Sequence, residues 1–318
     1  MPSCCICLCV YNNEIGLPFI LKNIDTLREA CLFDNIQILV FYDISKDSSL
    51  QILKNYKNGP ILIHENPSSI SLSRVERIAY ARNGLLQMIR DNFQNYEYFA
   101  MMDSNDYSCV GRIKPHILRE ILQRKDEWDS VSFDREDGYY DFWALSYNPY
   151  IYSFYHFKDY KQALEKLKND FHYRIELLRK TNPKEFFRVY SAFNGFAIYK
   201  TGVFIECRYS SDINILAFPP NSVSKHSEII QQLISRQTGH DCEHRFFHLD
   251  AIRRKDARIF ISLLSLFEKT NKSKNSFGLK TSDGRLRESP SLSSNTSTFL
   301  MKSRTTLKRT NKSMNFNL

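Results

Sequence analysis

Glycine and proline are scarce in this sequence, with 10 of each among 318 residues, whereas Phe (23) and Tyr (18) are abundant. Fibrous and low-complexity disordered chains have the opposite composition. No apolar stretch approaches the roughly 18–20 residues needed to cross a bilayer, and no cationic segment precedes the first apolar run. We therefore expect a globular, cytoplasmic protein with a sizeable core and no transmembrane segment.

The sequence also lacks paired C-x-x-C spacing, although four of its eight cysteines lie within the first nine residues. Such crowding suits neither a spaced disulfide framework nor a zinc site. The surrounding residues 4–11 are continuously apolar, as expected for a strand buried on both faces. We interpret these cysteines as reduced thiols in a buried strand rather than as a metal cluster.

The positive charge is confined to one end of the chain. Residues 269–318 contain eleven Lys or Arg against two acids, which accounts for the whole net charge of +9. This segment is rich in Ser, Thr and Asn without periodicity, and we expect it to be disordered. Because the remaining residues sum to zero charge, no basic stripe is expected on the folded body, and we predict no specific nucleic-acid partner. A weak contact of the tail with an anionic surface stays open.

The first hundred residues alternate strand-like and helix-like segments in the order that builds a parallel sheet with covering helices. The expected strands are 4–11, 36–42, 61–64 and 96–102, and the expected helices are 14–31, 48–56 and 72–92. This order predicts an α/β fold with a Rossmann-type, mostly parallel sheet.

The second half is less regular. It contains expected helices at 115–125, 159–180 and 257–267, expected strands at 128–134 and 191–199, and an aromatic stretch from 139 to 160. We predict a first half over 1–110, a second half of the same domain over 111–268, and the tail over 269–318.

Polar clusters follow three of the expected strands, at residues 11–14, 43–47 and 103–106. Taken singly, each cluster is equally typical of turns and helix caps. In an open α/β sheet, however, the carboxyl ends of the strands share one edge, where ligands bind. Acids at this edge can bind a base or ribose on one side and a hard cation such as Mg²⁺ or Mn²⁺ on the other.

Several segments resemble the GT-A class of nucleotide-sugar-dependent glycosyltransferases, and within it a group found in large DNA viruses and some microbes. The similar segments are residues 9–14 (CVYNNE), 41–48 (FYDISKDS), 74–83 (RVERIAYARN), 98–106 (YFAMMDSND), 139–145 (YYDFWAL), 193–196 (FNGF) and 242–248 (CEHRFFH). The resemblance covers about residues 3–250.

The resemblance implies a GT-A-like fold with a donor-binding half over 1–110 and an irregular acceptor and catalytic half over 111–268. It also implies a hexosyltransferase-type enzyme of glycan biosynthesis. It would move a sugar from a UDP- or GDP-sugar to a hydroxyl on a glycan, a protein or a small acceptor, in the cytoplasm of a host cell if the chain is viral. The candidate donor-binding residues are Tyr11, Asn12, Asn13, Asp43, Ser45, Asp47, Arg74 and Arg82.

The family's D-x-D metal motif is altered in this chain. A strict motif would place an acid at position 105, where the sequence has Asn105, and an acid follows at Asp106. Since an Asn carbonyl can ligate a hard cation, Asp103 with Asn105 or Asp106 is the expected Mn²⁺ or Mg²⁺ site. The resemblance adds a late histidine, His244, to this set. The alternative is a weakened or lost metal site in a non-catalytic donor-binding protein.

Two acids, Asp141 and Glu243, are candidates for a general base that deprotonates the acceptor hydroxyl if the reaction inverts the anomeric centre. Either acid could instead be a structural hydrogen-bonding group. The order E-H-x-x-x-H from Glu243 to His248 differs from the H-E-x-x-H of zinc proteases. A nucleotidyltransferase is a further alternative, but residues 11–14 lack the glycines of its phosphate-binding loop.

Two larger sets carry open alternatives. Arg74, Arg77 and Arg82 could pair with a diphosphate or could form an exposed charged helix face. The aromatic residues between 139 and 155 could line a sugar-stacking acceptor cleft or could belong to the core.

Overall fold

The computed structural model describes residues 2–67, 73–105, 108–213 and 240–268. Residues Met1–Thr270 form one compact unit. The predicted tail 269–318 and the candidate ligand Asp106 lie outside the described residues. No helix in these described ranges has both the length and the apolar character needed to cross a bilayer.

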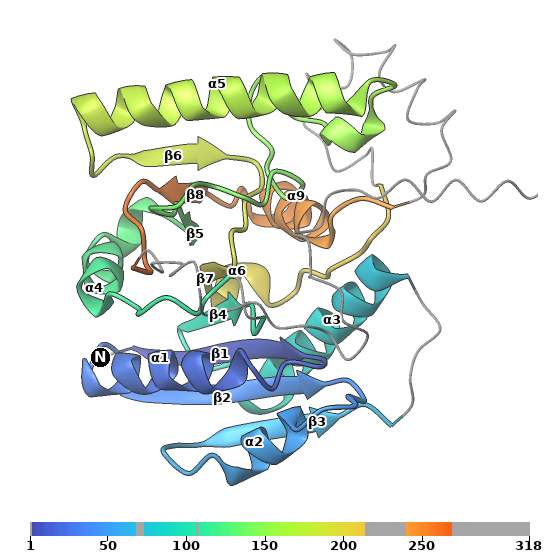
Figure 1. Ribbon diagram of the computed structural model, residues 1–318. Coiled ribbons are helices and arrows are strands. Elements are labelled where there is room, and N and C mark those ends of the chain that lie inside the picture. The colour runs from blue at the N-terminus through green and yellow to red at the C-terminus, as the bar shows by residue number, and fades with distance from the viewer. Residues whose placement is uncertain (1, 68–72, 106–107, 214–239, 269–318) are drawn as a thin grey trace, which may run out of the picture. The chain divides into compact units, whose positions relative to one another are not determined.

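Eight strands of the described chain form a single sheet in the order β3-β2-β1-β4-β7-β5-β8-β6 (Figure 1). Their bounds are β1 Ser3–Val10, β2 Asn35–Tyr42, β3 Ile61–Glu65, β4 Tyr98–Met102, β5 Ser130–Phe133, β6 Phe186–Val189, β7 Phe196–Lys200 and β8 Ile259–Ser262.

The sheet is mostly parallel, as predicted. Strand β1 pairs in parallel with β2 and β4, β2 with β3, and β5 with β8. Only β7 and β6 run in the opposite direction, because β7 is antiparallel to both β4 and β5, and β6 is antiparallel to β8. The carboxyl ends of β1, β2 and β4 therefore share one edge, which is where such sheets bind ligands.

Helices cover both faces of the sheet (Figure 1). One hydrophobic cluster joins one face to α1, α2 and α4, and a second joins the other face to α3, α5, α6 and α9. Their bounds are α1 Leu17–Glu29, α2 Ser49–Asn55, α3 Arg74–Asn92, α4 Pro115–Gln123, α5 Tyr160–Thr181, α6 Thr201–Phe204 and α9 Glu243–Lys255, with short 3₁₀ turns at Lys125–Glu127 and Phe154–His156.

The cysteine-rich first strand is buried as predicted. Cys4 belongs to the cluster on one face of the sheet, whereas Cys5 and Cys7 belong to the cluster on the other. Because Cys4 lies on the opposite side of the strand from Cys5 and Cys7, the thiols of β1 do not all converge on one metal ion. All eight cysteines are free thiols, and burial raises the pKa of Cys5 and of Cys9 to about 12. These side chains therefore act as small core hydrophobes.

The prediction of a helix over 257–267 is wrong, because this segment contains strand β8 between β5 and β6. A short apolar run fits a buried helix and a buried strand equally well, and here the open edge of β5 decides the outcome. The expected strand 191–199 is shorter than predicted and begins at Phe196, while the preceding β6 was not predicted. The second half thus extends the same sheet through β5, β6, β7 and β8.

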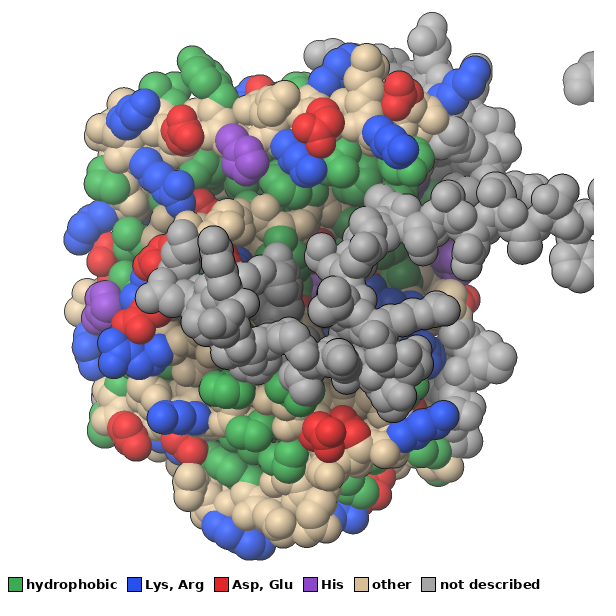
Figure 2. Space-filling view, viewed as in Figure 1, with side chains coloured by type: hydrophobic (Ala, Val, Ile, Leu, Met, Phe, Trp, Pro, Cys, Tyr) green, Lys and Arg blue, Asp and Glu red, His purple; other side chains and the backbone are tan. Residues whose placement is uncertain are grey.

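Charged side chains are mixed over the described surface. On the face seen in Figure 2, Lys and Arg are interspersed with Asp and Glu. Many form ion pairs along the helices, such as Lys168 with Glu165 and Arg174 with Asp170 on α5. This pattern is typical of a solvated surface.

The sheet core should be sensitive to loss of volume at its centre. Leu8 on β1 is completely buried, so Leu8→Ala should lower the free energy of unfolding by about 2–5 kcal/mol. Leu62 on β3 is 40% exposed, so Leu62→Ala should change it by no more than about 0.5 kcal/mol. Urea unfolding followed by circular dichroism measures both, and equal losses would contradict this description of the core.

Candidate functional site

The candidate site lies at the shared carboxyl edge of β1, β2 and β4. The loops that follow these strands contain all three predicted polar clusters, beginning at Tyr11, Asp43 and Asp103. The parallel register of β1 with its two neighbours brings the loops together. The edge predicted from the sequence is therefore the edge that the fold builds.

The first two loops are bonded directly to each other. The backbone N–H of Asn12 donates to Ser45 Oγ at 2.9 Å, and the N–H of Lys46 donates to Asn12 Oδ1 at 2.7 Å. Asn12 has a φ of 46°, in the left-handed region that Asn tolerates better than most residues. Asn12 and Ser45 thus hold the two loops in register.

Three more bonds extend this junction toward α2. The Glu14 N–H donates to Asp47 Oδ2 at 2.9 Å, and the Ser48 N–H donates to Glu14 Oε2 at 3.0 Å. The Asn13 N–H donates to Ser49 Oγ at 2.7 Å. Burial acts to raise the pKa of Asp47, but the donors around its carboxylate lower it overall. Hydrogen bonds thus join residues 11–14 to residues 43–49, and we call these two joined loops the site wall. The wall includes the predicted donor-site residues Asn12, Ser45 and Asp47.

Two predicted donor residues on this wall face outward. The Tyr11 side chain is 50% exposed, and the Arg77 guanidinium lies 5.5 Å from its ring centroid. Asp43 Oδ1 accepts from the N–H of Ile44 and from Asn66 Nδ2, both at 3.1 Å. The first loop thus offers an exposed aromatic ring, and the second loop offers a carboxylate fixed by two hydrogen bonds.

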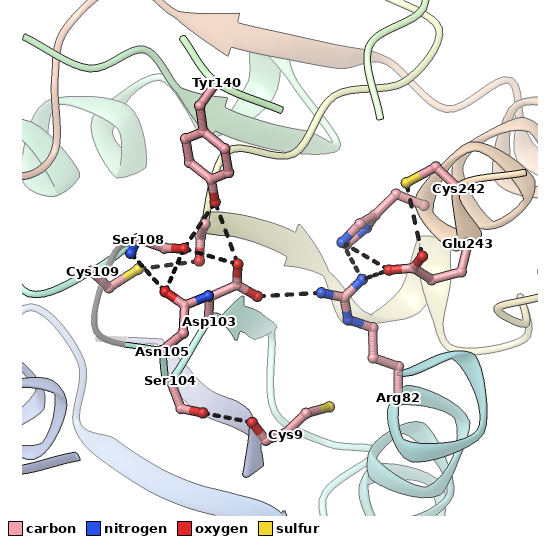
Figure 3. Close-up of polar contacts among 12 residues, drawn as sticks. Cys9, Arg82, Asp103, Ser104, Asn105, Ser108, Cys109, Tyr140, Cys242 and Glu243 are labelled. Carbon is pink, nitrogen blue, oxygen red and sulfur yellow. Dashed lines mark hydrogen bonds and ion pairs between the residues drawn. The ribbon is translucent and has the colours of Figure 1, made fainter. Parts of the chain in front are cut away.

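At the end of β4, the two oxygens of Asp103 face different partners (Figure 3). Oδ1 lies 3.4 Å from Arg82 Nη2, whereas Oδ2 lies 3.1 Å from Ser108 Oγ and 3.4 Å from the Tyr140 hydroxyl. A quarter of the side chain is exposed. Burial raises the pKa of Asp103, and the charge of Arg82 opposes this rise.

Asn105 shares the Ser108 contact with Asp103. Its Oδ1 accepts from the Ser108 N–H at 2.8 Å and lies 2.9 Å from Ser108 Oγ, which also receives a hydrogen bond from the Tyr140 hydroxyl at 2.9 Å. Oxygens of Asp103, Asn105 and Tyr140 thus all lie within hydrogen-bonding distance of Ser108 Oγ. Oxygen donors of this kind suit Mg²⁺ or Mn²⁺.

Gly195 holds this loop close to the sheet. Its carbonyl accepts from the Asp103 N–H at 2.7 Å, and its φ of +90° favours glycine. A Cβ at this position would lie 2.6 Å from the Cβ of Ser108. The approach of Ser108 to Asp103 therefore requires the absence of a side chain at residue 195.

Arg82 connects the loop that follows β4 to helix α9. Its side chain, which is only 8% exposed, bonds to the Glu243 carboxylate and to His244 Nε2 on α9 while Nη2 faces Asp103 (Figure 3). The guanidinium also lies over the Phe193 ring, 4.9 Å from its centroid. Burial acts to lower the pKa of Arg82, but Glu243 and Asp103 raise it overall, so this cation stays charged.

His244 is oriented by that contact. An arginine cannot accept a hydrogen bond, so Nε2 must be the accepting nitrogen and the ring proton must lie on Nδ1. The ring stacks on Phe193 at a centroid distance of 3.9 Å, and burial lowers its pKa well below the usual value. In this geometry the Nε2 lone pair points to Arg82, so metal ligation by His244 would require Arg82 to move. That role stays a prediction.

The two candidate bases have different environments. Glu243 Oε1 bonds to Arg82, and Oε2 lies 3.8 Å from the Cys242 thiol. Asp141 accepts one hydrogen bond, from the Ala144 N–H at 3.2 Å, and among the described residues its second oxygen has no hydrogen-bond donor. Burial, reinforced by the charges of Glu243 and Asp103, raises the pKa of Asp141 to about 7.

A sequence model described as glycosyl transferase family 2 matches residues 5–207, which span the donor edge, Arg82, Asp103 and Asp141. The chain belongs to glycosyl transferase family 2. No curated protein sequence matches the chain. Its predicted viral or microbial grouping stays a prediction.

Solved structures similar to this family 2 chain include TarS 1–349 of S. aureus, at 14% identity over 84% of this chain and 60% of that one, with a TM-score of 0.46. The Mn²⁺ and GDP-Man complex of the mannosyltransferase PcManGT from Pyrobaculum calidifontis is similar at 13% identity over 79% and 69%, with a TM-score of 0.40. Glucosyl-3-phosphoglycerate synthase of M. tuberculosis is similar at 11% identity over 64% and 58%, with a TM-score of 0.35. The chain thus spans less than two thirds of TarS 1–349.

The arginines of α3 separate into two groups. Arg74 is exposed at the first turn and Arg77 is half-buried over Tyr11, whereas Arg82 is buried among acids. Among the described residues, no group of three His, Cys, Asp or Glu side chains is arranged to hold a metal ion. The metal ligation predicted for Asp103 and Asn105 at this family 2 site therefore stays a prediction.

The aromatic stretch is mostly core. Tyr139, Phe142 and Tyr147 are buried and pack with Phe171 of α5. Tyr140 is the member that reaches the metal-motif loop. Its contact with Asp103, like that of Ser108, was not predicted from the sequence.

The loop junction gives a direct test of the site wall. Asn12→Ala and Asn12→Gly both remove the acceptor for the Lys46 N–H. Glycine adopts the left-handed φ of this position without steric cost, whereas alanine does so only at a cost in free energy. We expect the alanine variant to have a lower free energy of unfolding than the glycine variant by about 1 kcal/mol, measured by urea titration. Equal stabilities would show that residue 12 abandons this conformation when its side chain is lost.

Proposed function

We propose that the chain transfers a sugar, of hexose type, from a UDP- or GDP-sugar to a hydroxyl of a glycan, a protein or a small acceptor, with a divalent cation. The observation that carries this proposal is Asp103 at the ligand-binding edge of a family 2 sheet, where it faces the buried Arg82 and shares Ser108 with Asn105. The charges of Asp103 and Arg82 also act on the pKa of Asp141. This set combines cation-binding oxygens with a titratable acid near neutral pH.

Asp103 and Asn105 are the proposed holders of Mn²⁺ or Mg²⁺. The chemistry of their oxygens suits a hard cation, and the shared contact with Ser108 keeps these oxygens close together. Asp106 is a further candidate outside the described residues. When bound, the cation would neutralise charge on the departing nucleoside diphosphate.

The donor is proposed to lie along the site wall. Tyr11 offers an exposed ring for base stacking, and Asp43 offers a fixed acceptor. Asn12, Asn13, Ser45 and Asp47 would contribute through the shape of the wall. Arg74, whose charge acts on Asp103, is exposed and positioned to meet the diphosphate.

Asp141 is the proposed general base. Its second oxygen is available among the described residues, and a pKa of about 7 matches the operating range of a base at neutral pH. The carboxylate would take the proton of the acceptor hydroxyl as the oxygen attacks the anomeric carbon. This role implies inversion at that carbon.

The proposed division of labour follows the sheet. Residues 1–110 would supply the two loops of the site wall together with Asp103 and Asn105. Residues 111–268 would supply Tyr140, Asp141 and helix α9. The tail, 269–318, is proposed to be dispensable for chemistry and to make at most weak contacts with an anionic surface.

The function is tested by donor hydrolysis. The wild type, incubated with a panel of UDP- and GDP-sugars, should release nucleoside diphosphate only when Mn²⁺ or Mg²⁺ is present. Asp103→Ala should lower this rate by about 100-fold or more, since even partners outside a metal's first shell are worth 10–100-fold.

Glu127→Gln is the control, because Glu127 forms a surface ion pair with Arg124 away from the sheet edge. Absence of hydrolysis with every donor would contradict the transferase proposal. Binding of a donor without turnover would indicate a non-catalytic protein, and release of pyrophosphate from a nucleoside triphosphate would indicate a nucleotidyltransferase.

The base assignment predicts a pH profile. Since Asp141 acts as the ionised carboxylate, kcat/KM should fall about tenfold per pH unit below its pKa of about 7 and should level off above it. Asp141→Asn should lower kcat by about 10²–10⁴-fold and should abolish this acid limb. A limb that persists in the Asn variant would assign the base to another residue.

A further inference from the structure

The helix α9 lies outside the segment that matches the family, yet it supplies two of the residues around Arg82. Glu243 and His244 occupy its first turn and are both buried. Arg82 comes from α3, and Asp103 follows β4. One guanidinium therefore ties three elements together at the candidate site (Figure 3).

Glu243 is poorly arranged to act as a base. One of its oxygens bonds to Arg82, the other faces the Cys242 thiol, and its side chain is 8% exposed. Taking a proton from an acceptor would leave the charged guanidinium buried without its closest counter-ion. Such an uncompensated buried charge is costly.

Arg82 is arranged to transmit the position of Glu243. A guanidinium is planar, so anchoring one nitrogen sets the direction of the others. Here Nη1 bonds to the α9 residues and Nη2 faces Asp103 Oδ1 at 3.4 Å. The rings of Phe193 and Tyr209 lie 4.9 and 5.6 Å from the guanidinium carbon and limit its movement.

The position of the Arg82 guanidinium affects the orientation of the Asp103 carboxylate. With Oδ1 turned to Arg82, Oδ2 is turned to Ser108 and Tyr140, beside the Asn105 oxygen. If Glu243 lost its charge, Asp103 would be the remaining carboxylate in contact with Arg82 among the described residues. The guanidinium would then shift toward Asp103 and compete with a bound cation for its oxygens.

We propose that Glu243 is a positioning residue that acts through Arg82: it holds the guanidinium on the α9 side, so that the Asp103 carboxylate keeps its orientation and remains available to the cation. This inference rests on the proposed function and assigns α9 a role in cation affinity rather than in proton transfer.

The experiment compares Glu243→Gln, Arg82→Lys and the double variant in the full-length protein, using the nucleotide-sugar that the wild type hydrolyses. Glu243→Gln should raise the dissociation constant for Mn²⁺ by about tenfold, measured by calorimetric titration of Mn²⁺ without a donor, as expected for a residue that supports a metal ligand. The Mn²⁺ concentration for half-maximal activity should rise in parallel. The acid limb of kcat/KM should persist but move below pH 7, because the Glu243 charge that helps to raise the pKa of Asp141 is gone. The Mn²⁺ requirement of the double variant should exceed that of the more impaired single variant by no more than about twofold, because both substitutions break the same linkage.

The matched control is Asp250→Asn on the same helix. Asp250 is also buried and pairs with Arg254 at 2.9 Å, but it lies away from Asp103 and should leave the Mn²⁺ requirement unchanged. Thermal unfolding checks that each variant is folded. If Glu243→Gln does not fold, Glu243→Asp, which keeps the charge on a shorter stem, should show the same shift in Mn²⁺ requirement to a smaller extent.

Loss of the acid limb in Glu243→Gln would overturn the inference and make Glu243 the base. An unchanged Mn²⁺ requirement in a folded Glu243 variant would overturn it as well, as would independent, additive effects of the two substitutions. These outcomes differ from failure of the proposed function, in which the wild type itself would hydrolyse no donor.

Discussion

A buried arginine shared by two carboxylates is the interaction on which the site depends. Arg82 is almost inaccessible to solvent, and a charge in such a place is tolerated only with counter-ions. Asp103 and Glu243 supply them from opposite sides. Because these acids come from the end of β4 and the start of α9, the pairing of one guanidinium requires α3, the sheet and α9 to meet at one point.

The topology explains how such distant residues can meet. After β4 the chain forms β5 and β6, and it then inserts the antiparallel β7 between β4 and β5. Helix α9 follows β7, packs on the same face as α3 and leads into β8. Phe193 and Gly195, just before β7, then lie against Arg82 and the metal-motif loop, respectively. The second half thus completes the site by adding α9 and the segment before β7 on the face of the sheet that α3 covers.

Much of the first half could be predicted from the sequence, because its strands and helices are long and periodic and each feeds a loop to one edge. The strand β8 could not, since four residues of apolar sequence carry no distinguishing period. Asp103 and Asn105 could be identified from the strand they follow. Their contacts with Ser108 and Tyr140 depend on side-chain directions that no spacing encodes.

The same limit applies to the late residues. Glu243 and Arg82 are separated by 161 positions, and only the folded sheet brings them together. The sequence could therefore rank Glu243 beside Asp141 as an acid of interest without separating their environments. The distinction comes from Arg82, which contacts one of them directly and acts on the other only through its charge.

The bonds between the loops after β1 and β2 have a consequence for the energetics of association. Asn12, Glu14 and Asp47 already hold each other, so these segments have given up their conformational entropy during folding. A ligand that settles against them meets a surface that needs little ordering, and more of its contact energy remains as affinity. The affinity of a ligand at this edge would then depend on how well its shape fits the two loops, and little of the binding free energy would be spent on ordering them.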